Sequence, residues 1–245
     1  MGYYNYQNGL IYRHLNQEGG WDDHHDHCRS FILKALDFYR PEKITVLGSG
    51  WLLDLPIAEM VERTGKICLV DIVHPPDVIN QVGKLKNVEL IEQDVTGGLI
   101  EEVWQKKRES SYLNKLRSLQ NIIVPEYRPD YEPGMVISLN ILTQLESLLV
   151  DYLKKGSFIK EEELNFFRTE IQKKHVDFLL KHKSVLITDI TEIFTDKSGN
   201  VTYIPTAFID LPNGQCKEEW SWHFDLVRSD FYNKKSILKV VGIII

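Results

Sequence analysis

The sequence predicts an α/β fold: a doubly wound, mostly parallel sheet of the seven-stranded type, with helices on both faces and an antiparallel hairpin at its C-terminal edge. Two observations lead to this prediction. Short apolar runs rich in β-branched residues alternate with helical patterns between residues 44 and 190. The remaining residues, 191–245, read as consecutive β segments with no helix between them.

The first half of the chain alternates helix and strand patterns. Apolar positions at helical spacing predict a helix over residues 22–39, which Asp22 or Asp23 would cap. A strand over 44–47 follows, then a glycine turn and a helical pattern over 52–63 that begins at once. Strands over 67–70 and 88–91 flank a short helix over 75–82. Two successive strand–helix–strand units favour a parallel sheet.

The second half continues this alternation before it changes character. A charged helix over 98–121 and a proline-containing connection lead to a strand over 135–139. Helices over 141–152 and 161–181 precede a strand over 185–190. We expect a hairpin over 191–209 that turns at 197–200, and two further β segments over 220–227 and 237–245.

Length and composition favour one domain over residues 1–245. It divides into an N-terminal cap helix region (1–43), a cofactor-binding core (44–190) and a β-rich edge (191–245). The net charge of −6, with basic residues scattered, argues against sequence-independent nucleic-acid binding. The three cysteines lie far apart, and neither a signal-peptide pattern nor an apolar run of membrane-spanning length is present. We therefore expect a cytoplasmic protein with reduced thiols and no membrane partner.

Three features follow three successive predicted strands: the turn Gly48-Ser49-Gly50, Asp71 and Asp94. The carboxyl ends of strands in a doubly wound sheet form the edge where ligands bind. Asp71 follows Gly50 at about the 20-residue spacing at which an acidic side chain accepts hydrogen bonds from a ribose. The alternative is that both aspartates are ordinary cap or turn residues. Their joint placement favours a nucleotide-like cofactor.

These segments resemble the class I, Rossmann-like S-adenosylmethionine-dependent methyltransferases. The resemblance covers roughly residues 44–190, through VLGSG, LVD ending at Asp71, EQDV containing Asp94 and VISLN ending at Asn140. The last two β segments resemble the antiparallel hairpin that closes the methyltransferase sheet.

The resemblance implies specific contacts with S-adenosylmethionine. It implies that Gly48, Ser49 and Gly50 approach the methionine moiety and the ribose, and that Asp71 binds the ribose hydroxyls. It places Asp94 and Val95 at the adenine, and Asn140 near the transferred methyl group.

The sequence departs from the family pattern at two positions. Val46 stands where the family usually has an acidic residue, and Leu52 stands in place of the third glycine. Asp54 is a candidate to bind the ammonium group of the cofactor instead, or it only organises the start of the following helix. The third glycine of a dinucleotide-binding fingerprint would fall on Leu53, which disfavours a nicotinamide-dependent oxidoreductase.

Methyl transfer to oxygen or nitrogen requires a proton acceptor, and we consider two. His175 interrupts the apolar face of the helix over 161–181, where it is a catalytic base or a hydrogen-bonded core histidine. Asp189 ends the predicted strand over 185–190, where it is a base or a turn residue.

The segment from Trp21 to His27 crowds imidazoles and carboxylates together. His24, His25 and His27 project in different directions from a helix, so we predict no metal site. Trp21 with His24 or His25 could instead line a cover over the cofactor, or the segment is a solvated helix start. Trp51 shields the ligand or anchors the core.

The leading hypothesis is therefore a methyltransferase with a small-molecule or protein acceptor, whose oligomeric state the sequence does not indicate. Two alternatives use the same scaffold: aminopropyl transfer from the same type of cofactor, and a non-catalytic protein that binds a nucleoside or a protein partner.

Overall fold

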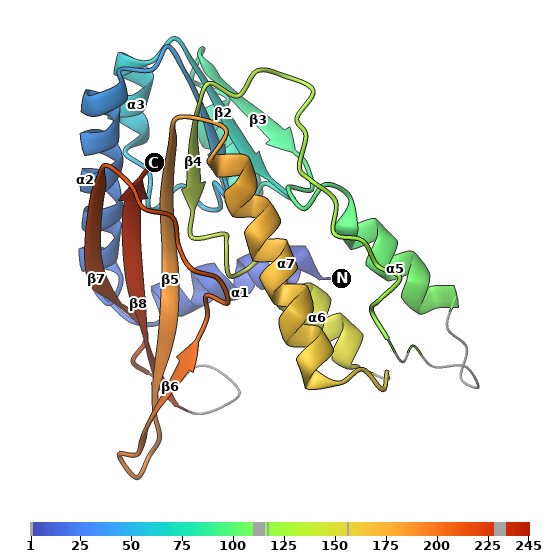
Figure 1. The fold of residues 1–245 in the computed structure, drawn as a ribbon. Coiled ribbons are helices and arrows are strands. Elements are labelled where there is room, and N and C mark those ends of the chain that lie inside the picture. Colours follow the sequence, from blue (N-terminus) through green and yellow to red (C-terminus); the bar gives the residue numbers. More distant parts are fainter. Residues whose placement is uncertain (1, 110–115, 117, 156, 228–233) are drawn as a thin grey trace.

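The computed structural model describes residues 2–109, 116, 118–155, 157–227 and 234–245 of the chain (Figure 1). Its strands form one eight-stranded sheet in the order β3-β2-β1-β4-β5-β8-β7, with β6 paired to β5. The strands are β1 (Lys43–Leu47), β2 (Lys66–Asp71), β3 (Val88–Glu92), β4 (Met135–Leu139), β5 (Ser184–Thr195), β6 (Val201–Pro205), β7 (Cys216–Asp225) and β8 (Lys235–Ile244).

Strands β1 to β5 pair in parallel, whereas β8 runs antiparallel between β5 and β7. The predicted mostly parallel sheet with an antiparallel C-terminal edge is therefore confirmed. The hairpin of β5 and β6 is also confirmed, with Thr191 opposite Pro205. Because β5 continues past the end of β4, this hairpin adds an eighth strand beyond the seven of the main order.

Helices cover both faces of the sheet (Figure 1). One apolar core lies between the sheet and helices α2 (Asp22–Tyr39), α3 (Ile57–Arg63) and α4 (Pro76–Val82). A second core lies between the opposite face and helices α5 (Leu99–Glu109), α6 (Ser147–Lys154) and α7 (Glu161–Leu179). The all-buried pattern of β4 and the near-continuous burial of β1 and β2 are those of a parallel sheet covered on both sides.

The predicted helix over 52–63 is wrong at its start, since α3 begins at Ile57. Leu52 has a φ of 63°, in the left-handed region that helices exclude. Pro56 disfavours helical backbone at the residue before it. The expectation that a helix N-terminus directly follows the glycine turn is therefore also wrong.

The predicted helix over 141–152 likewise begins later, at Ser147. Asn140 has a φ of 51°, and successive turns follow, closed by hydrogen bonds from Gln144 N and Leu145 N to Ile141 O. Leu142 and Leu145 lie in these turns and are buried. Their three-residue spacing is also that of a helix face, which explains the wrong prediction. In the charged segment predicted as a helix over 98–121, α5 ends at Glu109, and residues 110–115 and 117 lie outside the described residues.

One helix was not predicted. Helix α1 (Tyr3–Leu15) precedes α2 and crosses the edge at the carboxyl ends of the parallel strands (Figure 1). It contains no fully buried residue, so its apolar side chains do not follow the strong stripe by which a core helix is recognised. The N-terminal cap region thus contains two helices where one was expected.

Gly242 of β8 provides a test of how closely α2 packs on the sheet. A Cβ at this position would lie 2.9 Å from two ring atoms of Phe31 on α2. We therefore expect Gly242→Ala to lower the free energy of unfolding by about 1–3 kcal/mol, measured by urea denaturation, because the core has no room for another carbon. Gly9→Ala on α1, where a Cβ meets open space, is the control and should have no destabilising effect. Equal losses in both variants would contradict this packing.

Candidate functional site

A cavity opens at the carboxyl ends of β1, β2, β3 and β4. It is lined by the loops that follow these strands and is covered by α1. Trp21, His25 and Trp222 contribute from the start of α2 and from β7. The cavity therefore lies at the sheet edge at which the sequence places its ligand-binding residues.

The glycine turn after β1 is held against β2. Gly48 N and Ser49 N lie 2.9 and 3.3 Å from Val70 O, to which they donate. Gly48 has a φ of 81°, and a Cβ there would lie 2.8 Å from Leu139 O and from Ile141 Cβ on the loop side of β4. Gly48 is thus required by close packing between strands, whereas Gly50, with a φ of 50°, faces open space.

The left-handed backbone continues at Leu52, where the resembled family has glycine. Its φ of 63° is unusual for a branched residue, and its side chain is buried in the first core. The turn therefore keeps a backbone conformation typical of glycine at position 52, although the residue there is leucine.

Asp71 is buried at the end of β2 and binds the glycine turn. Its Oδ2 accepts from Gly50 N at 2.9 Å and its Oδ1 from Ile72 N at 2.7 Å. Gln7 Nε2 of α1 lies 3.4 Å from both oxygens. Burial raises the pKa of this carboxyl above its usual range, and the backbone donors act in the opposite direction. Asp71 is more than a turn residue, since it also faces the cavity.

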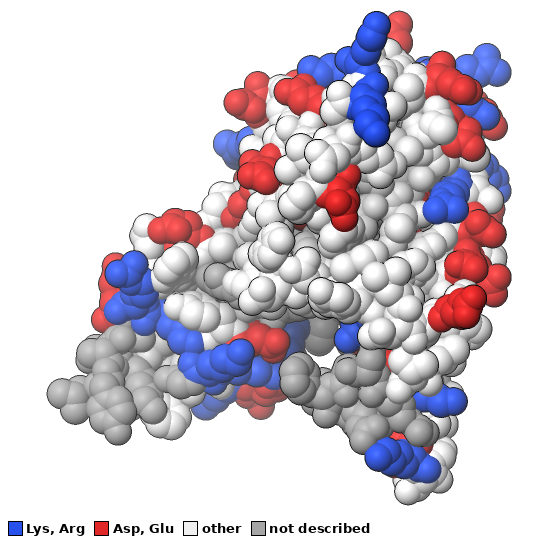
Figure 2. Space-filling model, turned by 180° about the vertical axis from the view of Figure 1, so that it is seen from behind, with Lys and Arg blue, Asp and Glu red and all other residues white. Residues whose placement is uncertain are grey.

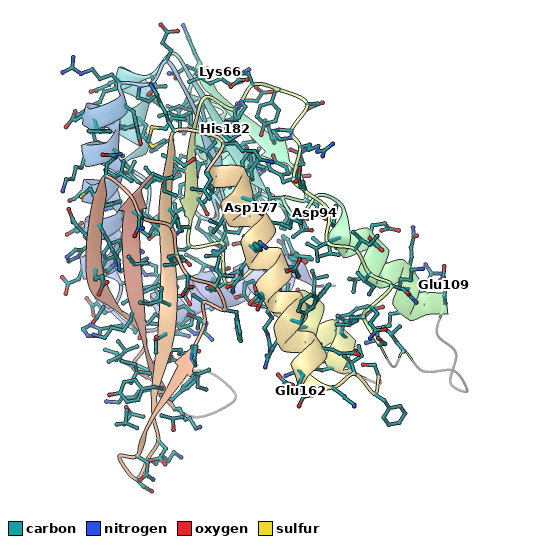
Figure 3. All side chains as sticks on the ribbon, in the orientation of Figure 1. Lys66, Asp94, Glu109, Glu162, Asp177 and His182 are labelled. Carbon is teal, nitrogen blue, oxygen red and sulfur yellow. The ribbon has the colours of Figure 1, made fainter. Side chains whose placement is uncertain are left out.

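Asp94 and Val95 line the cavity after β3, where Figure 3 shows Asp94 near the start of α5. Asp94 Oδ1 accepts from Thr96 N at 2.8 Å and from the Thr96 hydroxyl, and its Oδ2 lies 3.3 Å from Ile100 N. The carboxylate therefore organises the loop and the first turn of α5, as the turn-residue alternative expected, while the loop itself bounds the cavity.

Asn140 and Asp54 meet at the centre of the site. Asn140 Nδ2 donates to Asp54 Oδ2 at 3.0 Å, and both residues line the cavity. Burial raises the pKa of Asp54 to about 6. Asn140 Oδ1 and Asp54 Oδ1 are buried without a hydrogen-bond partner among the described residues.

His25 and the two tryptophans form a second wall of the cavity. His25 Nε2 lies 3.4 Å from Asp54 Oδ1, and burial, with a smaller contribution from His14, lowers the pKa of His25 to about 4. Trp21 packs edge-on against Trp222 at 4.9 Å between ring centroids. The expectation that Trp21 and His25 border the cavity agrees with their positions, whereas His24 is not among the lining residues.

Several cavity residues were not predicted from the sequence. Trp222 alternates with Trp220 along β7, and this two-residue period could have indicated one shared face of a strand. Tyr3, Tyr6 and Gln7 lie on the unpredicted helix α1, so no signal for their position was available.

His24, Cys28 and Asp54 each place a potential ligand atom within 4.8 Å of the others, in a geometry that could hold a metal ion. The hydrogen bonding of His24 argues against this use. The indole Nε1 of Trp220 lies 3.0 Å from His24 Nδ1 and can only donate. His24 Nδ1 must then be the acceptor, and Nε2, the atom that faces Cys28 and Asp54, also lies 3.1 Å from Asn140 Nδ2. Both ring nitrogens of His24 thus already have a polar protein partner, which disfavours a metal-ligand role for this histidine.

The two predicted proton acceptors lie away from the described lining of the cavity. His175 is buried with Nε2 2.8 Å from Ser138 Oγ, and burial lowers its pKa to about 4. Asp189 accepts from Thr143 Oγ1 at 2.6 Å, and burial raises its pKa. Burial, with a smaller contribution from Asp189, raises the pKa of Tyr6, which does line the cavity. The catalytic roles of His175 and Asp189 stay predictions.

The face of the molecule seen from behind carries mixed charge (Figure 2). In the described part of the face seen in Figure 2, Lys and Arg are interspersed with Asp and Glu, and the centre is uncharged. None of the helices within the described residues has the length and apolar composition that crossing a membrane requires.

No protein-family model and no curated protein matches this sequence. A solved structure of the DhpI–SAH complex is 10% identical, covers 98% of this chain and 94% of its own, and has a TM-score of 0.40. The methyltransferase domain of bacterial CtHen1-CN is 12% identical, with coverages of 87% and 95% and a TM-score of 0.30. Precorrin 8w decarboxylase from Methanobacterium thermoautotrophicum is 14% identical, with coverages of 88% and 89% and a TM-score of 0.28.

A further buried acid lies next to the site. Glu146 precedes α6 and is 4% exposed, with Gln172 Nε2 3.4 Å from its Oε1. Burial, with a smaller contribution from Asp189, raises the pKa of Glu146 to about 8.

Glu146 should make stability depend on pH. Its pKa is higher in the folded than in the unfolded state, so its ionisation opposes folding as pH rises from about 4.5 to 8. We expect Glu146→Gln to increase the free energy of unfolding by at least ~2 kcal/mol at pH 9, and to have little effect at pH 4. Urea denaturation at both values measures this difference. A gain that is equal at pH 4 and pH 9 would show that Glu146 does not titrate in this way.

Proposed function

We propose that this protein is an S-adenosylmethionine-dependent methyltransferase that acts on a small-molecule or protein acceptor. The observation that supports this most is the buried carboxylate of Asp71, which hydrogen bonds to the turn after β1 and faces a cavity at the carboxyl edge of a doubly wound sheet. This is the arrangement with which such sheets bind the ribose of a nucleotide-like ligand.

The polar atoms around Asp71 are consistent with such a ligand. Ser49 Oγ and Gln7 Oε1 are buried at the cavity with no hydrogen bond to another described residue. Leaving such atoms unpaired costs free energy, which a ribose with its hydroxyl groups would recover. The contacts of Gln7 Nε2 with Asp71, at 3.4 Å, are long and readily replaced.

The remaining cavity residues suit the other parts of this cofactor. We propose that Asp94 and Val95 border the adenine, that Gly48, Ser49 and Gly50 lie along the ribose and the methionine moiety, and that Asn140 lies near the reacting centre. Val95 supplies apolar contact, and the open space at Gly50 leaves room for a ligand. When bound, S-adenosylmethionine supplies a methyl group activated by a sulfonium.

Helix α1 would exclude water from this site. Its side chains Tyr3, Tyr6 and Gln7 line the cavity, and Trp51 Nε1 donates to Gln7 O at 3.0 Å. Excluding water strengthens electrostatic interactions within a site and protects a reactive ligand. For an oxygen or nitrogen acceptor, His175 and Asp189 stay the proposed bases, and both are buried outside the described lining of the cavity.

Calorimetric titration with S-adenosylhomocysteine tests the proposal. We expect binding, and we expect Asp71→Ala to weaken it by about 1–3 kcal/mol because the ribose hydroxyls lose their acceptor. Asp77→Ala, an exposed position outside the described cavity lining, is the control and should bind like the unaltered protein. Absence of binding at millimolar ligand would contradict the proposal, and unchanged affinity in Asp71→Ala would contradict this position of the ribose.

Hydrogen exchange tests the covering role of α1. We expect S-adenosylhomocysteine to slow amide exchange in α1, because a ligand below the helix adds contacts to an element that has no fully buried residue. The amides of α3, which contributes nothing to the described cavity lining, are an internal control. Equal protection of both helices would indicate a general stabilisation instead of closure by α1.

A further inference from the structure

Three buried polar atoms of residues that line the cavity have no hydrogen-bond partner among the described residues: His25 Nε2, Asn140 Oδ1 and Trp222 Nε1. Their residues are 5%, 6% and 5% exposed, and all three line the cavity. Each such atom costs free energy if it stays unpaired. Their gathering at one cavity points to a polar ligand that pairs them.

We call this part of the cavity the aromatic end and define it by Trp21, His25, Asp54 and Trp222. His25 extends from α2, Asp54 from the loop after β1, and Trp222 from β7. Trp21 lies between the other rings, with centroids 6.1 Å from His25 and 4.9 Å from Trp222. The other indole nitrogen here is used, since Trp21 Nε1 donates to Phe224 O at 3.0 Å. Of the two indole nitrogens at the aromatic end, that of Trp21 is therefore paired, and that of Trp222 has no partner among the described residues.

The chemistry of these groups is complementary. The indole Nε1 of Trp222 can only donate, and a neutral imidazole can donate from Nε2, so together they suit an oxygen anion. The acids that line the described cavity are Asp54, Asp71 and Asp94. The oxygens of Asp71 and Asp94 already accept from backbone nitrogens, whereas Asp54 Oδ1 accepts no hydrogen bond from another described residue and lies 3.4 Å from His25 Nε2. Asp54 is thus the acid that remains to bind a cation.

We propose that the aromatic end binds a zwitterionic α-amino-acid group, with its ammonium at Asp54 and its carboxylate at Trp222 Nε1 and His25 Nε2. If the group is the amino-acid portion of S-adenosylmethionine, this inference rests on the proposed function. It accounts for Val46, which offers no charge at the position where the resembled family has an acid. A separate amino-acid substrate would present the same chemistry.

The test compares S-adenosylhomocysteine with 5′-methylthioadenosine, which has the same thioether nucleoside without the amino-acid group. We expect the unaltered protein to bind S-adenosylhomocysteine at least tenfold more tightly by calorimetry. Trp222→Phe and Asp54→Asn should each remove most of this ratio and leave 5′-methylthioadenosine binding within twofold. Asp71→Ala should weaken both ligands alike, and Trp104→Phe on α5, outside the described lining, should change neither. Thermal melting of each variant confirms folding.

The outcomes separate the two sources and the two proposals. In one outcome, S-adenosylhomocysteine and 5′-methylthioadenosine bind equally tightly, and free methionine then binds to the complex of the unaltered protein with 5′-methylthioadenosine. If methionine does not bind to the same complex of the Trp222→Phe variant, the amino-acid group belongs to a separate substrate. If neither nucleoside binds, the proposed function fails, and methionine binding that Asp54→Asn abolishes would still support the aromatic end. The inference is overturned if Trp222→Phe and Asp54→Asn leave the ratio of the two affinities unchanged. It is also overturned if S-adenosylhomocysteine and 5′-methylthioadenosine bind equally and methionine does not bind.

Discussion

The hydrogen bond from Gly50 N to Asp71 Oδ2 joins the carboxyl ends of β1 and β2, and the geometry of the candidate site depends on it. Together with the bonds from Gly48 N and Ser49 N to Val70 O, it fixes the glycine turn to the next strand. A carboxylate that is buried for this purpose needs donors, and backbone nitrogens supply them without a compensating positive charge. The same carboxylate faces the cavity, so one group both stabilises the turn and presents acceptor oxygens to the cavity.

Backbone strain surrounds this bond. Leu52 and Asn140 both have positive φ, at 63° and 51°, and they follow β1 and β4, the two central strands at the cavity. Such conformations persist only where the surrounding structure enforces them, and they concentrate at functional sites. Here the strain keeps helices α3 and α6 from starting directly after their strands. The resulting loops place Asp54 and Gln144 at the cavity, where continuous helices would have moved them.

The sequence predicts the strands of this protein well, because their alternation with helices and their β-branched residues are local signals. It also places Asp71, Asp94 and Asn140 at one edge, since parallel strands end together. It does not predict α1, whose apolar side chains face a cavity and so lack the stripe of a core helix. Nor does it bring Trp222 to Trp21 and His24, because those contacts require β7 and the start of α2 to pack together although they lie far apart in the sequence.

The central claim is that the edge from Asp71 to the aromatic end binds one adenosyl amino acid, and a crystal structure with S-adenosylhomocysteine tests it most directly. We predict ribose hydroxyls within hydrogen-bond distance of Asp71, with the side-chain amide of Gln7 displaced. The ammonium and carboxylate should lie against Asp54 and Trp222. Ligand density outside this cavity, or a ribose that does not contact Asp71, would contradict the account.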